Sequence, residues 1–256
     1  MSRPLYFMHL TDPHIAIGAK QVQFGVDTTA AFLRVLAAVR ELTPSPDFVL
    51  ITGDLVADGC PESYEAFRDL VRSLPMPVHL SLGNHDERRN FRRVVLECPD
   101  ASEAPYCYVF RSGETDFLVL DSCPAATLDA DQLGWLSDRL GESQGAIVCV
   151  HHHPVPTGLV WLDRLILRNG EELTALVRSC RRVQGVLFGH IHRTFEEDLG
   201  GVPLLGTPST CFQFTPRSES REISAEPPAY RVVTVEDGRL SSEVRWLGEG
   251  ETPGRS

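Results

Sequence analysis

Short apolar runs alternate with amphipathic segments along most of the chain. The runs are typical of buried strands and lie at Leu5–Leu10, Phe48–Thr52, Val78–Leu82, Phe117–Leu120, Ala146–Val150 and Val186–Phe188. Between them, apolar residues recur at helical spacing after a cap at Thr28 or Thr29, after Pro61, and near Asp129–Leu140 and Glu171–Arg181. This alternation predicts an α/β fold whose strands are buried on both faces.

The C-terminal part of the chain has a different pattern. Strands are predicted at Val202–Leu205, Tyr230–Val235 and Ser242–Trp246, with no helices between them. We expect them to complete a second sheet, which gives two sheets flanked by helices. The polar, proline-containing residues 216–228 predict a loop or flap, and residues 247–256 predict a frayed tail. With no repeat and no linker, residues 1–246 are expected to form one domain.

Composition narrows the class of protein. The 256 residues contain no apolar stretch of about 18 to 20 residues, and no signal-peptide pattern, so we expect no membrane span. Seven cysteines without a CxxC pair favour a reducing cytoplasm. A net charge of −11 with a single lysine disfavours nucleic-acid binding. An acidic protein that binds an anionic substrate needs a local positive charge, which metal ions would supply.

Polar side chains with metal-binding chemistry follow five of the predicted strands. In open α/β sheets, the loops beyond the carboxyl ends of the strands form the ligand crevice. These loops carry Asp12 and His14, Asp54, Asn84 with His85 and Asp86, the tract His151–His153, and His190 with His192. The sequence therefore predicts a cluster of carboxylate, imidazole and amide groups at one edge.

The donor types and spacings agree with a metal site. Nitrogen and oxygen donors without thiolate suit Zn²⁺, Mn²⁺, Fe or Co²⁺. In the D-x-H and H-x-H pairs, extended backbone would point both side chains to the same side. Glycines before Asp54, Asn84 and His190 would allow tight turns. D-x-H alone is short and common, and G-D is usually a turn, but five such motifs in this order are improbable by coincidence.

The order D-x-H, G-D, G-N-H-D, H-x-P and G-H-x-H resembles the calcineurin-like metallophosphoesterases, which are two-metal hydrolases on a four-layer αββα sandwich. A narrower resemblance covers nearly the whole chain. The stretches G-V-D-T-T (25–29), H-H-H-P-V-P-T-G (151–158), W-L-D-R-L-I-L-R-N (161–169) and P-S-T-C-F-Q-F (208–214) are similar to those of bacterial class III cyclic nucleotide phosphodiesterases. The resemblance implies a phosphodiesterase of 3′,5′-cyclic nucleotides, with cyclic AMP favoured.

The resemblance also implies a role for each residue in the motifs. Asp12, His14 and His192 would hold a first ion, Asn84, His152 and His190 a second, and Asp54 would bridge them. Mn²⁺ and Fe are favoured, with Zn²⁺ or Co²⁺ as alternatives. A hydroxide shared by the ions would attack phosphorus, while His85 contacts the phosphate or donates a proton. Asn84 and His153 are the other expected substrate contacts.

Within the histidine tract, strand alternation alone does not choose between the face with His151 and His153 and the face with His152. The pattern H-x-P favours His152. Asp86 either orients His85 or caps a turn. His9, His79, Asp121 and Cys149 are more typical of structural residues, and Trp161, Arg168 and Asn169 are candidates for a substrate loop.

Alternative functions stay open. The same chemistry would serve glycerophosphodiesters, 2′,3′-cyclic nucleotides or other small phosphodiesters. A non-catalytic scaffold is disfavoured because no expected ligand is missing, and a nuclease is disfavoured by the net charge of −11. The C-terminal strands leave pairing across a homodimer open.

Overall fold

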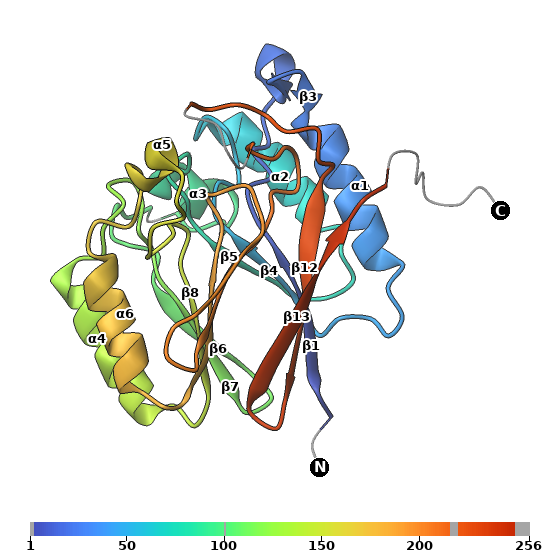
Figure 1. Ribbon diagram of the computed structural model, residues 1–256. Coiled ribbons are helices and arrows are strands. Elements are labelled where there is room, and N and C mark those ends of the chain that lie inside the picture. The colour runs from blue at the N-terminus through green and yellow to red at the C-terminus, as the bar shows by residue number, and fades with distance from the viewer. Residues whose placement is uncertain (1–2, 100, 216–219, 249–256) are drawn as a thin grey trace.

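The computed structural model describes residues 3–99, 101–215 and 220–248, and two β-sheets pack face to face at its centre (Figure 1). The first sheet has the order β13-β12-β1-β4-β5. Its parallel strands are β1 (Leu5–Leu10), β4 (Val49–Thr52) and β5 (Val78–Ser81). Strand β12 (Ala229–Glu236) runs antiparallel to β1, and β13 (Arg239–Trp246) forms the edge.

The second sheet has the order β10-β11-β9-β8-β7-β6. Four neighbouring strands are parallel: β11 (Pro203–Gly206), β9 (Val183–Phe188), β8 (Ala146–Cys149) and β7 (Thr115–Val119). The two edge strands, β10 (Phe195–Asp198) and β6 (Tyr108–Ser112), are antiparallel to their neighbours. Both sheets are thus mixed, with parallel strands at their centres.

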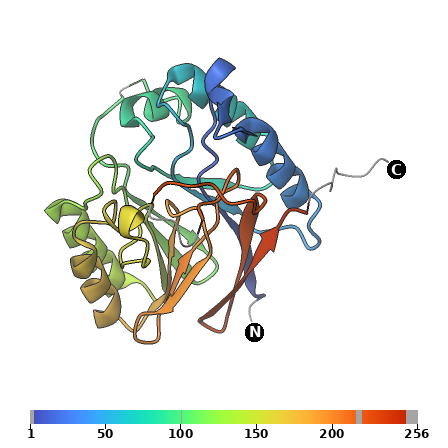
Figure 2. The ribbon, with the colours of Figure 1, turned by 45° about the horizontal axis from the view of Figure 1, so that its top comes forward.

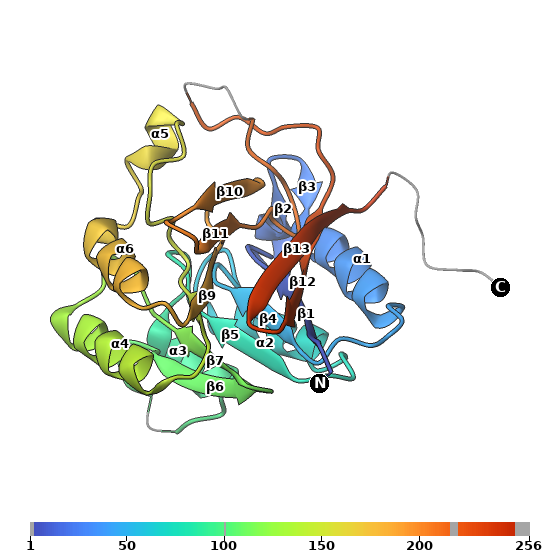
Figure 3. The same ribbon diagram turned by 60° about the horizontal axis from the view of Figure 1, so that its bottom comes forward.

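Helices cover the outer faces of both sheets. On the first sheet lie α1 (Thr28–Arg40), α2 (Pro61–Val71) and α3 (Arg88–Val94), while α4 (Ala130–Glu142) and α6 (Gly170–Ser179) cover the second. Figures 2 and 3 show α4 and α6 side by side on the flank opposite α1. Aromatic rings fill the space between the sheets, where the Phe48 ring lies 4.7 Å from that of Phe7 and 5.1 Å from that of Phe117. The predicted sandwich of two mixed sheets flanked by helices is confirmed.

Shorter elements complete the structure. The hairpin of β2 (Val22–Gln23) and β3 (Val26–Asp27) follows the 3-10 helix η1 (Gly18–Gln21), and α5 (Val160–Asp163) is a single turn. No helix within the described residues is both long and apolar enough to cross a membrane.

Some elements differ from those predicted. Strands β12 and β13 extend the first sheet, because β12 pairs with β1 from Leu5 to His9 and so places β1 inside the sheet. Strands β6 and β10 were missed, since edge strands carry few buried residues. Helix α3 was also missed, because four of its seven residues are arginine and mask its apolar face.

The start of α1 and the start of the C-terminal tail also differ from their predicted positions. The cap of α1 is Asp27, whose side chain accepts a hydrogen bond from the Ala30 amide, whereas Thr28 donates to the His14 carbonyl. Leu247, expected in the tail, is buried against the first sheet's helices, and its amide donates to Pro228. Residues 249–256 and 216–219 lie outside the described residues. The rest of the expected flap includes an antiparallel bridge between Phe214 and Ile223.

Candidate metal centre

The five predicted loops meet at one edge of the sandwich, beyond the carboxyl ends of β1, β4, β5, β8 and β9. Three groups of side chains, which share some members, could each hold a metal ion. Within each group, the potential ligand atoms lie within 4.8 Å of one another. The groups are Asp12, His14 and His192; His14, Asp54 and His85; and Asp54, His151 and His190. Loops from both sheets therefore build a single site, as the strand-end pattern predicted.

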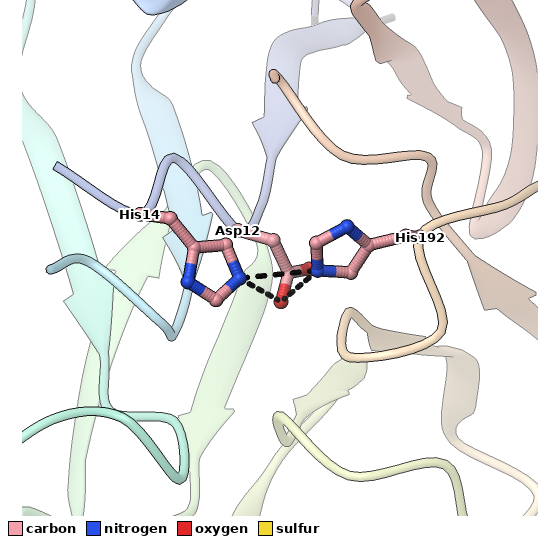
Figure 4. Close-up of side chains that lie close together, drawn as sticks. All are labelled: Asp12, His14 and His192. Carbon is pink, nitrogen blue, oxygen red and sulfur yellow. Dashed lines mark hydrogen bonds and ion pairs between the residues drawn. The ribbon is translucent and has the colours of Figure 1, made fainter. Parts of the chain in front are cut away.

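The first group converges on one oxygen of Asp12 (Figure 4). Asp12 Oδ1 lies 3.4 Å from His192 Nε2 and 4.0 Å from His14 Nε2, and the two nitrogens are 3.1 Å apart. His192 Nδ1 donates to the Phe212 carbonyl at 2.8 Å. Because a carbonyl oxygen only accepts, Nδ1 carries the proton and Nε2 presents a lone pair to the centre of the group.

The group of Asp54, His151 and His190 gathers around His151, and we call it the second donor group, with Asp12, His14 and His192 as the first. His151 Nε2 lies 3.4 Å from Asp54 Oδ2 and 3.2 Å from Asn84 Oδ1, and its Nδ1 donates to the Thr52 carbonyl at 2.7 Å. His190 completes the group, held by its amide's hydrogen bond to Asp12 Oδ2. The Asn84 amide oxygen therefore faces the same point as a carboxylate and two imidazoles.

Asp54 stands between the two groups. Its Oδ2 is 3.4 Å from His151 Nε2 and 3.6 Å from His14 Nε2, while its Oδ1 accepts from the His85 amide at 2.8 Å. One carboxylate oxygen thus faces donors from both groups, which is the geometry that a shared ligand requires.

The histidine tract differs from the prediction. His151, not His152, faces Asp54 and Asn84, whereas His152 Nδ1 lies 2.7 Å from the Ser122 hydroxyl. Strand β8 ends at Cys149, and the Thr52 carbonyl on β4, in the other sheet, then fixes the His151 ring. The structure thus brings His151 next to Asp54 and Asn84, and it does not bring the predicted His152 there. His153 is fully buried and stacks on the His190 ring with centroids 5.5 Å apart, and it is not among the residues that line the cleft beside the site.

Glycines let these loops pack directly on one another. A Cβ atom on Gly83 would overlap the Asp54 amide and carboxylate, and one on Gly53 would overlap the His151 ring. The sequence predicted that these glycines let the backbone approach the ions. In the structure they let the loops that carry Asp54, Asn84 and His151 approach one another.

Burial and neighbouring charges shift the pKa values of the histidines in the site in opposite directions. Burial lowers the pKa of His14 to about 3 and holds the pKa values of His152 and His190 well below their usual range. Burial also disfavours charge on His151, but the Asp54 and Asp12 carboxylates outweigh it and raise its pKa to about 9. His151 in turn counters the effect of burial on Asp54, whose pKa stays well below its usual value.

These features fit a pair of divalent cations. Asp12 Oδ1 and His190 Nε2 are buried and have no hydrogen-bond partner among the residues that the structure describes. Buried carboxylate oxygens and imidazole lone pairs that face a common point need a positive charge. The donors are imidazole, carboxylate and amide, and the Cys211 thiol donates to the backbone carbonyl of Asp12.

His85 and Asp86 take separate positions. The His85 ring lies 4.8 Å from that of His14, and its Nδ1 donates to the Ala57 carbonyl at 2.9 Å. Asp86 accepts hydrogen bonds from the Gly83 and Leu55 amides at 2.8 and 3.1 Å. It therefore caps the turn and joins two of the loops, and the Ala57 carbonyl, not Asp86, orients the His85 ring.

Four residues that the sequence analysis considered more typical of structural roles lie in the sheets or in buried ion pairs. His9, His79 and Cys149 lie within the sheets, and Asp121 is buried in an ion pair with Arg88. Of the three loop candidates, Trp161 packs on Phe214 with ring centroids 5.0 Å apart, and Asn169 bonds the backbone of Leu128. The Arg168 amide donates to the Ala126 carbonyl.

A cleft adjoins the metal centre and contains residues that the sequence did not single out. Besides candidate ligands and His85, it is lined by Gln23, Phe24, Phe212, Phe214, Leu165 and Arg221. Phe212 and Phe214 belong to the stretch P-S-T-C-F-Q-F, which was therefore the available signal for them. Phe24 lies in a two-residue turn that the sequence did not predict, and Arg221 lies in the predicted loop 216–228, whose polar composition singles out no residue.

The fold and site define a metallophosphoesterase, and residues 5–194 match the family model of the calcineurin-like phosphoesterases. The chain belongs to that family. It is 33% identical over 248 residues to a 3′,5′-cyclic-nucleotide phosphodiesterase of Nostoc sp., covering 94% of this chain and 92% of the relative. It is 32% identical over 250 residues to the 3′,5′-cyclic adenosine monophosphate phosphodiesterase CpdA of Escherichia coli, covering 94% and 90%.

A solved structure shares the fold at greater distance. A dimetal phosphatase from Danio rerio is 15% identical and superposes with a TM-score of 0.69, covering 96% of this chain and 100% of that chain.

Proposed function

We propose that the protein is a metal-dependent phosphodiesterase that hydrolyses 3′,5′-cyclic nucleotides, with cyclic AMP favoured. The observation that carries the proposal is the pair of donor groups on either side of Asp54, whose Oδ2 lies 3.4 Å from His151 Nε2 and 3.6 Å from His14 Nε2. The relatives named for cyclic nucleotide hydrolysis, each matching over 94% of this chain, support the choice of substrate.

In this proposal each donor group holds one ion. Asp12, His14 and His192 bind the first, Asn84, His151 and His190 bind the second, and Asp54 is shared. Mn²⁺ or Fe is favoured, and Zn²⁺ or Co²⁺ also suits the donors. When bound, such ions supply the charge that activates water and neutralises phosphoryl oxygens.

The chain's own residues supply positioning and a proton. His85 lines the cleft with its Nδ1 fixed on the Ala57 carbonyl, so its Nε2 is the atom available to the substrate. In its protonated form this imidazole donates a proton to the leaving alkoxide, which is a poor leaving group otherwise. Asn84, beside His85 in the cleft, contacts the phosphate as well as the second ion.

A substrate panel tests the assignment. We expect Mn²⁺-loaded protein to have its highest kcat/KM on 3′,5′-cyclic AMP, compared with 2′,3′-cyclic AMP and a glycerophosphodiester. The alternative substrates use the same chemistry, so a higher kcat/KM on either of them would replace the proposed substrate while leaving the metal chemistry intact.

The domain, the cellular compartment and the oligomeric state of the protein can also be proposed. We propose that residues 1–246 act as one catalytic domain in the reducing cytoplasm, in keeping with the scattered cysteines. A homodimer formed through the edge strand β13 is tested by the mass of the protein in solution.

A further inference from the structure

The wall of the cleft next to the first donor group is aromatic. The Phe212 ring lies 4.8 Å from that of His192 and stacks on that of His14 at 5.7 Å. Phe214 stacks on His192 at 4.5 Å. Both phenylalanines are buried, so they support the candidate ligands from behind. Beyond them the wall continues to a third ring, Phe24, whose centroid is 5.1 Å from that of Phe212.

Phe24 is held at the mouth of the cleft in an unfavourable backbone conformation. It forms the two-residue turn of the β2–β3 hairpin with Gly25, and both have positive φ angles, 50° and 81°. Asparagine, aspartate or glycine usually occupies such a turn, because a bulky side chain is strained there. The residue is nevertheless 53% exposed. An exposed aromatic residue in a strained turn indicates a role other than packing.

The hairpin is fixed to the metal centre. Gln23 Nε2 donates to the His14 carbonyl at 3.0 Å, and Thr28 Oγ1 donates to the same oxygen at 2.9 Å. The position of the Phe24 ring is therefore set relative to a candidate ligand. In Figure 1 the hairpin and α5 lie at the same end of the molecule, and Leu165, just after α5, also lines the cleft.

Arg221 brings the only lysine or arginine side chain to this cleft among the residues that the structure describes. Its guanidinium carbon lies 5.8 Å from the Phe24 ring centre and 5.4 Å from that of Phe214. It forms no ion pair within the described ranges 3–99, 101–215 and 220–248. A planar cation next to an exposed ring can stack on, and donate hydrogen bonds to, a heteroaromatic group.

We propose that Phe24 and Arg221 form a subsite for the nucleobase of the substrate, outside the metal centre. The inference rests on the proposed function and adds the part of the molecule that reads the organic group. The base stacks on the exposed Phe24 ring, and the guanidinium donates to its ring nitrogen or carbonyl acceptors. The donor groups and His85 hold only the phosphate and sugar, so the two halves of the substrate are bound by different residues.

The test compares two substrates that differ only in the base. One is 3′,5′-cyclic AMP, and the other is the base-free analogue, 1-deoxyribose 3,5-cyclic phosphate. Loss of a stacking ring typically lowers affinity by about 5- to 100-fold. We expect Phe24→Ala to lower kcat/KM for cyclic AMP within this range, mainly through KM, and to leave the base-free analogue nearly unchanged. Phe24→Trp should restore most of the loss.

Arg221→Ala should follow the same pattern with a smaller loss, about 3- to 10-fold. Matched controls are Val22→Ala, which is exposed in the same hairpin but does not line the cleft, and Arg239→Ala, which is exposed on β13. Neither control should alter kcat/KM for either substrate. Calorimetric binding of cyclic AMP to His85→Ala protein, with and without Phe24→Ala, gives the same comparison without turnover.

The outcomes separate this inference from the proposed function. If wild-type protein cleaves the base-free analogue but not cyclic AMP, the proposed function fails. If wild-type protein cleaves cyclic AMP and the two variants lose equally on both substrates, or on neither, the nucleobase subsite is overturned while the proposed function stands.

Discussion

Five of the candidate ligands have left-handed backbone conformations. The φ angles of Asp12, His14, Asp54, His190 and His192 lie between 46° and 69°. Such conformations cost non-glycine residues on the order of 1–3 kcal/mol each and persist where the surroundings fix them. Here the amides of Asp12 and His14 donate to the carbonyls of Gly53 and Asp54 at 3.1 and 3.0 Å. The paired side chains of D-x-H therefore face one site through tight turns, and not through the extended backbone that the spacing suggested.

The histidine tract gives a prediction at this scale. His151→Ala should lower kcat by at least about 100-fold and reduce metal content, because it removes a nitrogen facing Asp54 and Asn84. His152→Ala, one residue away, should keep kcat within about tenfold, because its Nδ1 bonds Ser122. Metal analysis of both purified variants checks this. Normal metal content in His151→Ala protein, with loss of metal in His152→Ala protein, would instead support His152 as the ligand, as the H-x-P pattern predicts.

At the scale of elements, a chain of hydrogen bonds links β1, β4 and β12 to the site. The two ring nitrogens of His9 lie 2.7 Å from the hydroxyls of Thr52 and Thr207. The fully buried Arg231 donates to Thr207 Oγ1 at 3.3 Å and forms an ion pair with Glu196. Since the Thr52 carbonyl holds His151 Nδ1, the strands orient a candidate ligand through shared polar contacts.

We therefore predict that His9→Leu weakens metal affinity by about tenfold, because it removes a hydrogen-bond partner from each of the two threonine hydroxyls and loosens β4 beneath His151. Competition with a chelator measures this affinity. The control is His79→Leu, which removes a histidine from β5, where its ring stacks on Phe110 away from the site. Equal metal affinity in the two variants would limit His9 to a role in stability.

His79 itself predicts a pH dependence of stability. Burial lowers its pKa to about 4, against 6.5 in the unfolded chain. Between pH 6.5 and 4 the unfolded state therefore binds a proton that the folded state does not, so the free energy of unfolding falls as the pH falls. In His79→Phe protein this contribution is absent, and stability should fall less steeply in that window. Urea unfolding at pH 7.5 and 4.5, with chelator present, compares the two, and parallel losses would contradict the assignment.

At the scale of the whole molecule, the site exists because two sheets end at the same edge. The buried runs and the polar residues after them were enough to predict this edge, since parallel strands carry continuous apolar stretches. The sheet that β12 joins was not predictable in the same way, because pairing between distant strands leaves no local pattern. The side on which the His151 ring lies likewise depends on the Thr52 carbonyl, a contact 99 positions away. Phe24 and Arg221 meet only in the folded chain.

The whole molecule should also depend on its ions for stability. Ions that bind only the folded state stabilise it by mass action, and they relieve the buried negative charge of Asp12 and Asp54. We predict that removing metal lowers Tm by several degrees and that Mn²⁺ restores it. Scanning calorimetry measures the change, with Asp54→Asn protein as the variant in which Mn²⁺ should restore little. A Tm that does not respond to chelator or Mn²⁺ would contradict a metal centre.

The most direct measurement titrates Mn²⁺ into metal-stripped protein and follows cyclic AMP hydrolysis and bound metal together. The account predicts no turnover without metal, and a rate that rises until two ions are bound per chain. It also predicts that Asp54→Asn protein, which lacks the shared carboxylate, stays nearly inactive at any Mn²⁺ concentration. Two bound ions without cyclic AMP turnover would contradict the proposed substrate, and full turnover in stripped protein would contradict the metal mechanism.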